Sequence, residues 1–237
     1  MREIKISDEA EREENIEYIR SCLLGTIADF KGEVRAETVG QRTAMTLKAG
    51  REYYEYLKYE VEDKVAEVIA IKYKYEYFKA YIKAGGLSEL ETEMLFNALI
   101  AADLEEDKGY ISRKLRRFSE YAIDGVYNFR LGALKKKWAD IVGYIPTYFE
   151  RGRLADFISY LTAEKRGKTV TIENGVVYDR HYNILSRTQL LGDFKEGRIV
   201  REAILSSCGE VRLIGVLPET DKEYLKLFFP ERITFLS

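Results

Sequence analysis

Histidine, proline and cysteine are scarce in this chain of 237 residues, and each shortage removes a class of function. Because His181 is the single histidine, a two-histidine metal site cannot form within one chain, and His-Glu-x-x-His chemistry is excluded. Cys22 and Cys208 lie far apart and match no metal-binding spacing. They favour two thiols in a reducing cytoplasm over a disulfide. With three prolines, long uninterrupted helices are permitted.

The chain also lacks an excess of one charge and any long apolar run. It has 38 Lys and Arg against 40 Asp and Glu, a net charge of −2, so no global field directs it toward nucleic acid or a membrane. No run approaches the ~18 consecutive apolar residues that a membrane span requires. The charged N-terminus lacks the apolar core of a secretory signal. We therefore expect a cytoplasmic globular protein.

Motifs for catalysis and for phosphate binding are missing as well. Neither G-x-x-x-x-G-K-[ST] nor G-x-G-x-x-G after a strand occurs, and Gly192 and Gly197 before a helix are equally expected in a plain turn. His181 follows a predicted hairpin, where a solvated loop is expected. Cys208 falls at the predicted end of a helix, where the dipole disfavours a thiolate, so we expect it to be buried. We predict no catalytic residue, no metal and no cofactor.

Residues 1–50 are predicted to form a short α/β segment. The sequence 2–6 alternates as a strand does, and Ser7 or Asp8 is a candidate cap for an acidic helix that follows. The acidic residues of that helix complement its dipole without a ligand. Weaker patterns at 33–38 and 43–48 favour two strands.

Residues 51–166 are predicted to form a helical body of about five amphipathic helices. The segment 52–84 alternates locally like a strand, yet its apolar side chains recur every three or four residues along its whole length, which favours a helix ended by Gly85 and Gly86. Ser88 with Glu91 forms a capping box for the next helix. A third helix is expected over 111–122, a fourth over 131–145, and a fifth beginning at Pro146.

Residues 167–237 change character and predict a small mixed α/β region. Asn174-Gly175 between two β-favouring runs indicates a hairpin. A helix over 199–208 is then followed by a strand at 211–217, a helix with a capping box at Thr220 and Glu223, and a strand at 233–236, in the order of a parallel strand–helix–strand unit. The fold class is therefore α+β, with the C-terminal region sharing a core with the helical body.

One stretch, 108–137, is strongly basic although the whole chain is not. Its only acidic residues are Glu120 and Asp124. Its cations are Lys108, Arg113, Lys114, Arg116, Arg117, Arg130, Lys135, Lys136 and Lys137.

Two interpretations of this basic stretch stay open. The cations alternate with the apolar positions of two predicted helices, so neighbouring helices would project them together and bind phosphates. Tyr110, Tyr121 and Tyr127 lie nearby and offer rings for stacking on bases. The other interpretation, which the sequence favours, is a solvated polar face paired with the acidic N-terminal helix.

Two parts of the sequence resemble a known family. The first comprises Tyr-Asn-Phe-Arg-Leu at 127–131, Ile-Val at 141–142, Tyr-Phe-Glu-Arg at 148–151 and Phe-Ile at 157–158. The second runs from 202 to 237 and contains Phe-Phe-Pro-Glu-Arg-Ile at 228–233. Together they resemble the YtxC-like family of sporulation-associated proteins of endospore-forming Firmicutes. The likeness covers 127–237, whereas residues 1–126 match only in the order of elements.

The resemblance implies a bacterial cytoplasmic protein associated with sporulation, without established catalytic residues. Arg130, within its Phe-Arg-Leu, is the charged position that we expect to anchor a buried carboxylate. Our leading hypothesis is a non-enzymatic interaction protein with a protein partner. The alternatives are a binder of nucleic acid or another polyanion through 108–137, and an enzyme that uses carboxylates and the Arg/Lys cluster without histidine or metal.

Overall fold

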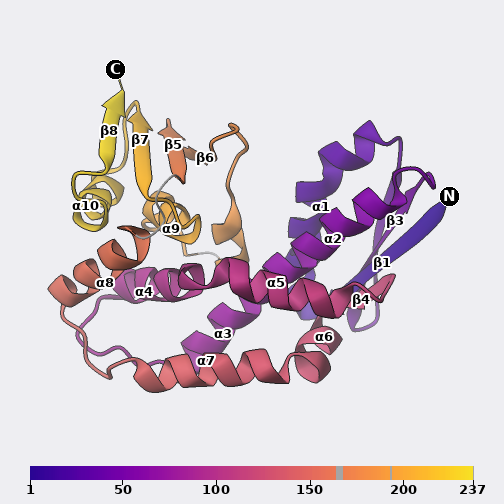
Figure 1. Ribbon diagram of the computed structural model, residues 1–237, viewed down its shortest axis with the longest axis horizontal. Coiled ribbons are helices and arrows are strands. Elements are labelled where there is room, and N and C mark those ends of the chain that lie inside the picture. Colours follow the sequence, from indigo (N-terminus) through magenta and orange to yellow (C-terminus); the bar gives the residue numbers. More distant parts are fainter. Residues whose placement is uncertain (164–167, 193, 237) are drawn as a thin grey trace. The chain divides into compact units, whose positions relative to one another are not determined.

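The computed structural model describes residues 1–163, 168–192 and 194–236, and within them the chain is an α+β protein with two four-stranded mixed sheets (Figure 1). The chain divides into two compact units. Unit 1 comprises Met1–Lys74 and Leu104–Asp140, and unit 2 comprises Tyr75–Asp103 and Ile141–Ser237. The predicted α+β class is confirmed. The prediction of a mainly helical body is only partly right, because the N-terminal part of the chain forms one of the two sheets. The predicted boundary at 166/167 lies outside the described residues.

The sheet of unit 1 is built largely from the N-terminal strands. Its strands are β1 (Arg2–Glu9), β2 (Glu33–Val39), β3 (Arg42–Ala49) and β4 (Glu120–Ala122), in the order β2-β3-β1-β4. β3 is antiparallel to both β1 and β2, whereas β4 is parallel to β1. The strands predicted at 2–6, 33–38 and 43–48 are confirmed.

The predicted helix cap at Ser7 or Asp8 is wrong. β1 pairs with β3 as far as Glu9, opposite Arg42, so both residues lie within the strand. A 3-10 turn, η1 (Ala10–Arg12), follows, and α1 (Glu13–Asp29) begins after it. Strand pairing across the whole length of β1 therefore outweighs the local capping preference.

The segment 52–84 is helical from Tyr54 to Tyr81, as predicted, but the helix ends before the predicted stop at Gly85 and Gly86. It forms α2 (Tyr54–Val68), a π-helical turn η2 (Ile69–Tyr73) and α3 (Lys74–Tyr81) without a break in the helical backbone. Leu57, Val61 and Val65 are buried on one face of α2. The π-helical turn falls in the part that alternates like a strand, and it buries all five of its residues, including the polar Lys72.

The predicted third helix extends too far toward the C-terminus. α5 (Leu104–Leu115) ends before residue 118, and β4 pairs with β1 so that Tyr121 lies opposite Ile6. The Tyr121 side chain is 1% exposed, and its hydroxyl donates to Glu62 Oε1 at 2.9 Å. Burying this ring and pairing its backbone stabilise a strand where the periodicity indicates helix. α6 (Ile123–Arg130) and α7 (Gly132–Tyr144) follow, and α7 confirms the helix predicted over 131–145.

Unit 2 begins its first complete helix as the sequence predicts. In α4 (Glu89–Ala102), Ser88 Oγ accepts from the backbone N–H of Glu91, and Glu91 Oε2 accepts from that of Ser88. The prediction that Pro146 starts the next helix is wrong, because α8 (Arg151–Ala163) begins five residues later. Backbone hydrogen bonds join Gly85 to Thr147 and Phe149 and keep this connection extended.

The sheet of unit 2 has the order β6-β5-β7-β8. Its strands are β5 (Thr169–Glu173), β6 (Val176–Tyr178), β7 (Glu210–Ile214) and β8 (Ile233–Leu236). The predicted hairpin is confirmed, with φ of 48° at Asn174 and 82° at Gly175, as a type I′ turn requires. β7 and β8 are parallel and are joined by α10 (Glu219–Phe228), as predicted.

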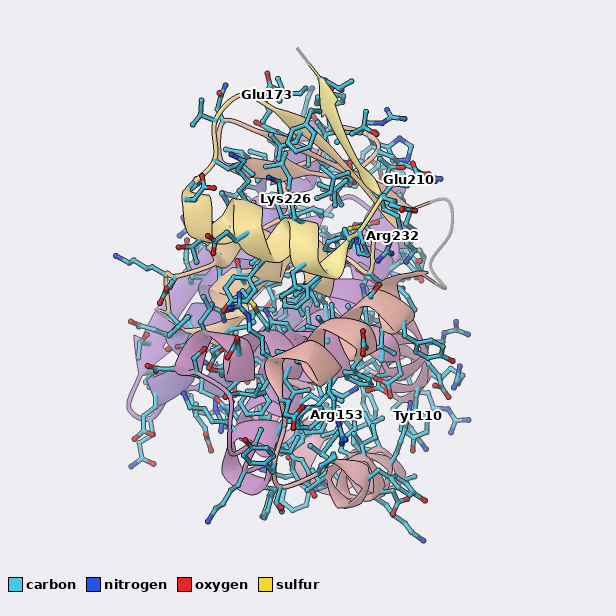
Figure 2. The ribbon with its side chains drawn as sticks, turned by 90° about the vertical axis from the view of Figure 1, so that its left-hand side faces the viewer. Tyr110, Arg153, Glu173, Glu210, Lys226 and Arg232 are labelled. Carbon is cyan, nitrogen blue, oxygen red and sulfur yellow. The ribbon has the colours of Figure 1, made fainter. Side chains whose placement is uncertain are left out.

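The capping box predicted at Thr220 does not form. Pro218 occupies the cap position of α10 and no side chain caps the helix, so Thr220 lies inside its first turn. At the other end of α10, Arg232 donates to the carbonyl of Phe228 at 2.8 Å and to Ser159 Oγ of α8 at 3.4 Å (Figure 2). Among the described residues, no helix is both long and apolar enough to cross a membrane.

Candidate polyanion-binding surface

The end of α5 in unit 1 carries four exposed cations. Ile111 and Leu115 are buried, so the residues between and after them turn outward. Arg113 and Lys114 belong to the last turn of α5, and their charged groups lie 5.9 and 5.3 Å from the ring centre of Tyr110. The turn that follows adds Arg116 and Arg117, both exposed.

Arg130 joins the end of α6 to this cluster. Its guanidinium lies 4.5 Å from the ring centre of Phe118, which directly follows Arg117. Contrary to the expectation drawn from the resemblance, Arg130 is exposed and anchors no carboxylate in the part of the chain that the structure describes. The contact with Phe118 places the guanidinium beside the cations that follow α5.

The first turns of α7 supply two more cations. Lys135 Nζ donates to the carbonyl of Asn128 at 3.2 Å and lies 5.0 Å from the ring centre of Tyr127. Lys136 is exposed. α6 ends at Arg130 and α7 begins at Gly132, so the two helices follow one another directly (Figure 1). We call the seven cations the basic surface: Arg113, Lys114, Arg116, Arg117, Arg130, Lys135 and Lys136.

The other two cations of the stretch have structural roles. Lys137 Nζ lies 2.8 Å from Asp107 Oδ1 and 2.9 Å from Glu106 Oε2, and so ties α7 to α5. Lys108 Nζ lies 2.9 Å from Asp63 Oδ1. Lys137, a predicted contact residue, is therefore already neutralised. Across residues 1–163, 168–192 and 194–236, no cation of the basic surface forms an ion pair.

The two local acids do not neutralise the basic surface either. Asp124 Oδ1 lies 2.7 Å from Arg42 Nη2, and hydrogen bonding to Arg42 lowers the pKa of Asp124 below its ordinary value. Glu120 lies 3.7 Å from Lys5. Both acids are thus paired with cations of the adjacent sheet, which leaves the charge of the basic surface uncompensated.

The acids around α1 also have partners elsewhere. Glu9 pairs with Arg12 at 3.0 Å, Glu14 Oε1 lies 3.2 Å from Lys72, and the carboxylate of Glu17 lies 3.1 Å from Arg20. The pairing between the acidic helix and the basic stretch that the sequence suggested does not occur among these described acids.

A hollow of about 280 Å³ between α2 and α5 borders the basic surface. Arg113 and Arg116 line it together with Lys108, but Glu62, Asp63 and Glu105 do so as well. Since Glu62 accepts from Tyr121 and Asp63 holds Lys108, these two carboxylates are already engaged. The mixed lining makes this hollow a poor anion pocket, so the exposed face is the better candidate site.

The aromatic residues near the basic surface differ in exposure, and the sequence does not reveal which of them are exposed. Tyr121 is buried, and Tyr127 packs on Tyr73 and Trp138 at ring-centre distances of 4.6 and 6.1 Å. Neither offers a free face for stacking. Phe129, by contrast, is 87% exposed beside Arg130. The apolar periodicity of the sequence does not mark Phe129 as exposed. Phe129 follows the buried Val126 by three residues, the spacing of side chains on one helix face.

The other two candidate residues, His181 and Cys208, lie where the sequence predicts, the first in an exposed loop and the second in the core. His181 lies exposed in a loop, where its Nε2 accepts from Arg180 Nε at 2.9 Å. Cys208 is fully buried, and burial raises its pKa to about 12. At the start of α9 (Arg198–Leu205), Asp221 Oδ1 already accepts from the backbone N–H of Val200 at 2.9 Å. The backbone N–H of Val200 is therefore not free to bind an anion, and residue 193 of the preceding turn lies outside the described residues.

Metal ligands do not gather anywhere in the part of the chain that the structure describes: no group of three or more His, Cys, Asp or Glu is placed to hold an ion. No protein-family model, curated protein or solved structure matches this chain.

Proposed function

We propose that this protein is a non-enzymatic interaction protein that binds the phosphate backbone of a nucleic acid through the basic surface. The observation that carries the proposal is a set of seven cations, six exposed and Lys135 half-buried, that form no ion pair among the described residues of a chain whose net charge is −2. Salt bridges within unit 1 engage the neighbouring acids, so the local positive charge is available to a ligand.

The chemistry of the basic surface suits phosphate. Four of its seven members are arginines, whose planar guanidinium presents paired donors to phosphate oxygens. Each phosphate that a cation neutralises releases counterions, so several weak contacts sum to useful affinity at low salt. Contacts of this kind carry no sequence information, and we expect binding without strong sequence preference.

Phe129 favours nucleic acid over an acidic protein as the partner. Aromatic rings exposed within a cationic surface stack on unpaired bases, a contact that an acidic protein surface does not offer. With 87% of its surface exposed, the Phe129 side chain is open to such stacking.

The resemblance to the YtxC-like family supplies the setting of this proposal. The resemblance implies a cytoplasmic protein of an endospore-forming bacterium with a role in sporulation. Such a protein could bind nucleic acid. A pull-down from sporulating cells with nuclease-treated and untreated lysates would reveal whether partners depend on nucleic acid.

Fluorescence anisotropy with labelled single-stranded DNA, duplex DNA and RNA at low salt tests the proposal directly. We expect the Arg116→Glu/Arg117→Glu variant to bind at least about tenfold more weakly than wild type. The matched control is Arg51→Glu/Lys226→Glu, which makes the same change in net charge at two exposed residues outside the basic surface. No binding by wild type at micromolar concentration, or equal losses in both variants, would refute the proposal.

A further inference from the structure

β2 forms an open edge of the sheet in unit 1. In the order β2-β3-β1-β4 it pairs only with β3, and among the described residues no other strand adds to it. Six of its seven residues are exposed and Val34 is half-buried, so no helix covers either face of the strand. An uncovered edge of this length is a template for another strand.

The turn that joins β2 to β3 fixes which backbone groups face outward. The two-residue connection Gly40-Gln41 brings Val39 opposite Arg42. In such a hairpin the residues flanking the turn exchange hydrogen bonds, and alternate residues along the strand do the same. Val39, Glu37, Arg35 and Glu33 therefore bond to β3. The N–H and C=O groups of Val34, Ala36 and Thr38 point to the open side.

We propose that β2 pairs with β2 of a second copy of this chain, antiparallel and about a twofold axis at Ala36. The outward backbone groups of Val34, Ala36 and Thr38 can exchange hydrogen bonds with a second strand when the axis lies at any residue from 34 to 38. An axis at Arg35 or Glu37 places two arginines or two glutamates opposite each other, which destabilises the pairing. An axis at Val34 or Thr38 pushes part of one strand past the end of its partner, whereas an axis at Ala36 pairs all seven residues of the strand. Ala36 then exchanges hydrogen bonds with Ala36 of the second copy, and Val34 with Thr38.

The charges of β2 are self-complementary in this register. Arg35 of each copy lies opposite Glu37 of the other, in the pairs without backbone hydrogen bonds, where side chains are closest. The twofold axis makes this opposite-charge pair twice. Arg35 and Glu37 share one face of the strand, and in the single chain they lie across from Thr46 and Ala44, which carry no charge. Neither residue forms an ion pair within the described part of the chain, so both are available to the second copy.

Sedimentation velocity of the full chain without nucleic acid, from about 1 to 200 µM, measures this association separately from nucleic-acid binding. We expect a concentration-dependent dimer. Arg35→Glu places like charges opposite each other, as does Glu37→Arg, and each should weaken dimerisation by about tenfold. The double variant Arg35→Glu/Glu37→Arg restores opposite charges and should return the dissociation constant to within about threefold of wild type.

Ala36→Pro provides a second probe that leaves the charges unchanged. It removes one outward N–H but none of the hydrogen bonds to β3, and proline is tolerated on edge strands, so the folded unit should persist by circular dichroism. We expect the variant to be monomeric throughout the concentration range. A monomeric wild type would overturn the inference. The inference would also be overturned if Arg35→Glu/Glu37→Arg associated no better than the single reversals, or if Ala36→Pro still dimerised.

Discussion

Lys74 Nζ lies 2.8 Å from Asp107 Oδ2, and the two side chains are 0% and 1% exposed. This ion pair joins the start of α3 to α5, and the indole N–H of Trp138 in α7 donates to the same oxygen at 3.0 Å. Removing one partner of a buried pair leaves an uncompensated charge, which costs about 3–5 kcal/mol.

We therefore expect Lys74→Met to lower the free energy of unfolding by about 3 kcal/mol, because Lys137 still compensates part of the Asp107 charge. Urea denaturation of the variant measures this loss. Lys136→Met, a change of the same type at an exposed site, should cost less than about 0.5 kcal/mol. Equal stability of the two variants would show that the Lys74–Asp107 pair does not support the fold.

The raised pKa of Asp8 predicts how the free energy of unfolding changes with pH. Its side chain is buried, and desolvation raises its pKa above the ordinary 3.8 despite hydrogen bonds from Asn15 and Tyr73. Between 3.8 and the raised value the folded chain binds more protons than the unfolded chain, so this group's contribution to stability falls as the pH rises through that window.

Asp8→Asn removes this titration. Urea unfolding of both proteins from about pH 3.5 to 7 should show wild type losing stability relative to Asp8→Asn as the pH rises. A difference between the two proteins that stays constant, or that moves in the opposite direction, would contradict the assignment.

We predict that the thiol of Cys208 reacts in the denatured protein but not in the native protein. Burial raises its pKa to about 12, so almost no thiolate exists near neutral pH, and alkylating reagents cannot reach the sulfur. Iodoacetamide at pH 8, followed by mass spectrometry of peptides, should modify Cys208 only in the denatured protein. Modification of Cys208 in the native protein at the rate of denatured protein would show that this part of unit 2 opens readily.

Local signals in the sequence predicted much of the fold. The long apolar periodicity of 52–84, the Ser88–Glu91 capping box and the Asn174-Gly175 turn each act within a few turns or residues, and all three are confirmed. The parallel unit of β7, α10 and β8 was also predicted, because its order of elements permits few arrangements.

Distant partners account for the failures. The strand at 120–122 depends on pairing with β1, more than a hundred residues earlier, and the extended segment after Pro146 depends on backbone bonds to Gly85. In the candidate site, Arg113 and Lys114 of α5 and Lys136 of α7 are exposed, as their positions between apolar residues indicate. That Lys137 is neutralised by Asp107, and that Phe129 is exposed, follows from the packing of α5, α6 and α7, which the sequence does not display.

The dependence of nucleic-acid affinity on salt tests the proposed function most directly. If the basic surface contacts about five to seven phosphates of a single strand, log K should fall with log salt concentration at a slope of about −3 to −5. Arg116→Gln should make this slope shallower by roughly one contact, about 0.7. Affinity for single-stranded DNA or RNA that does not change between about 50 and 200 mM KCl, or a slope unchanged by Arg116→Gln, would contradict phosphate binding by the basic surface.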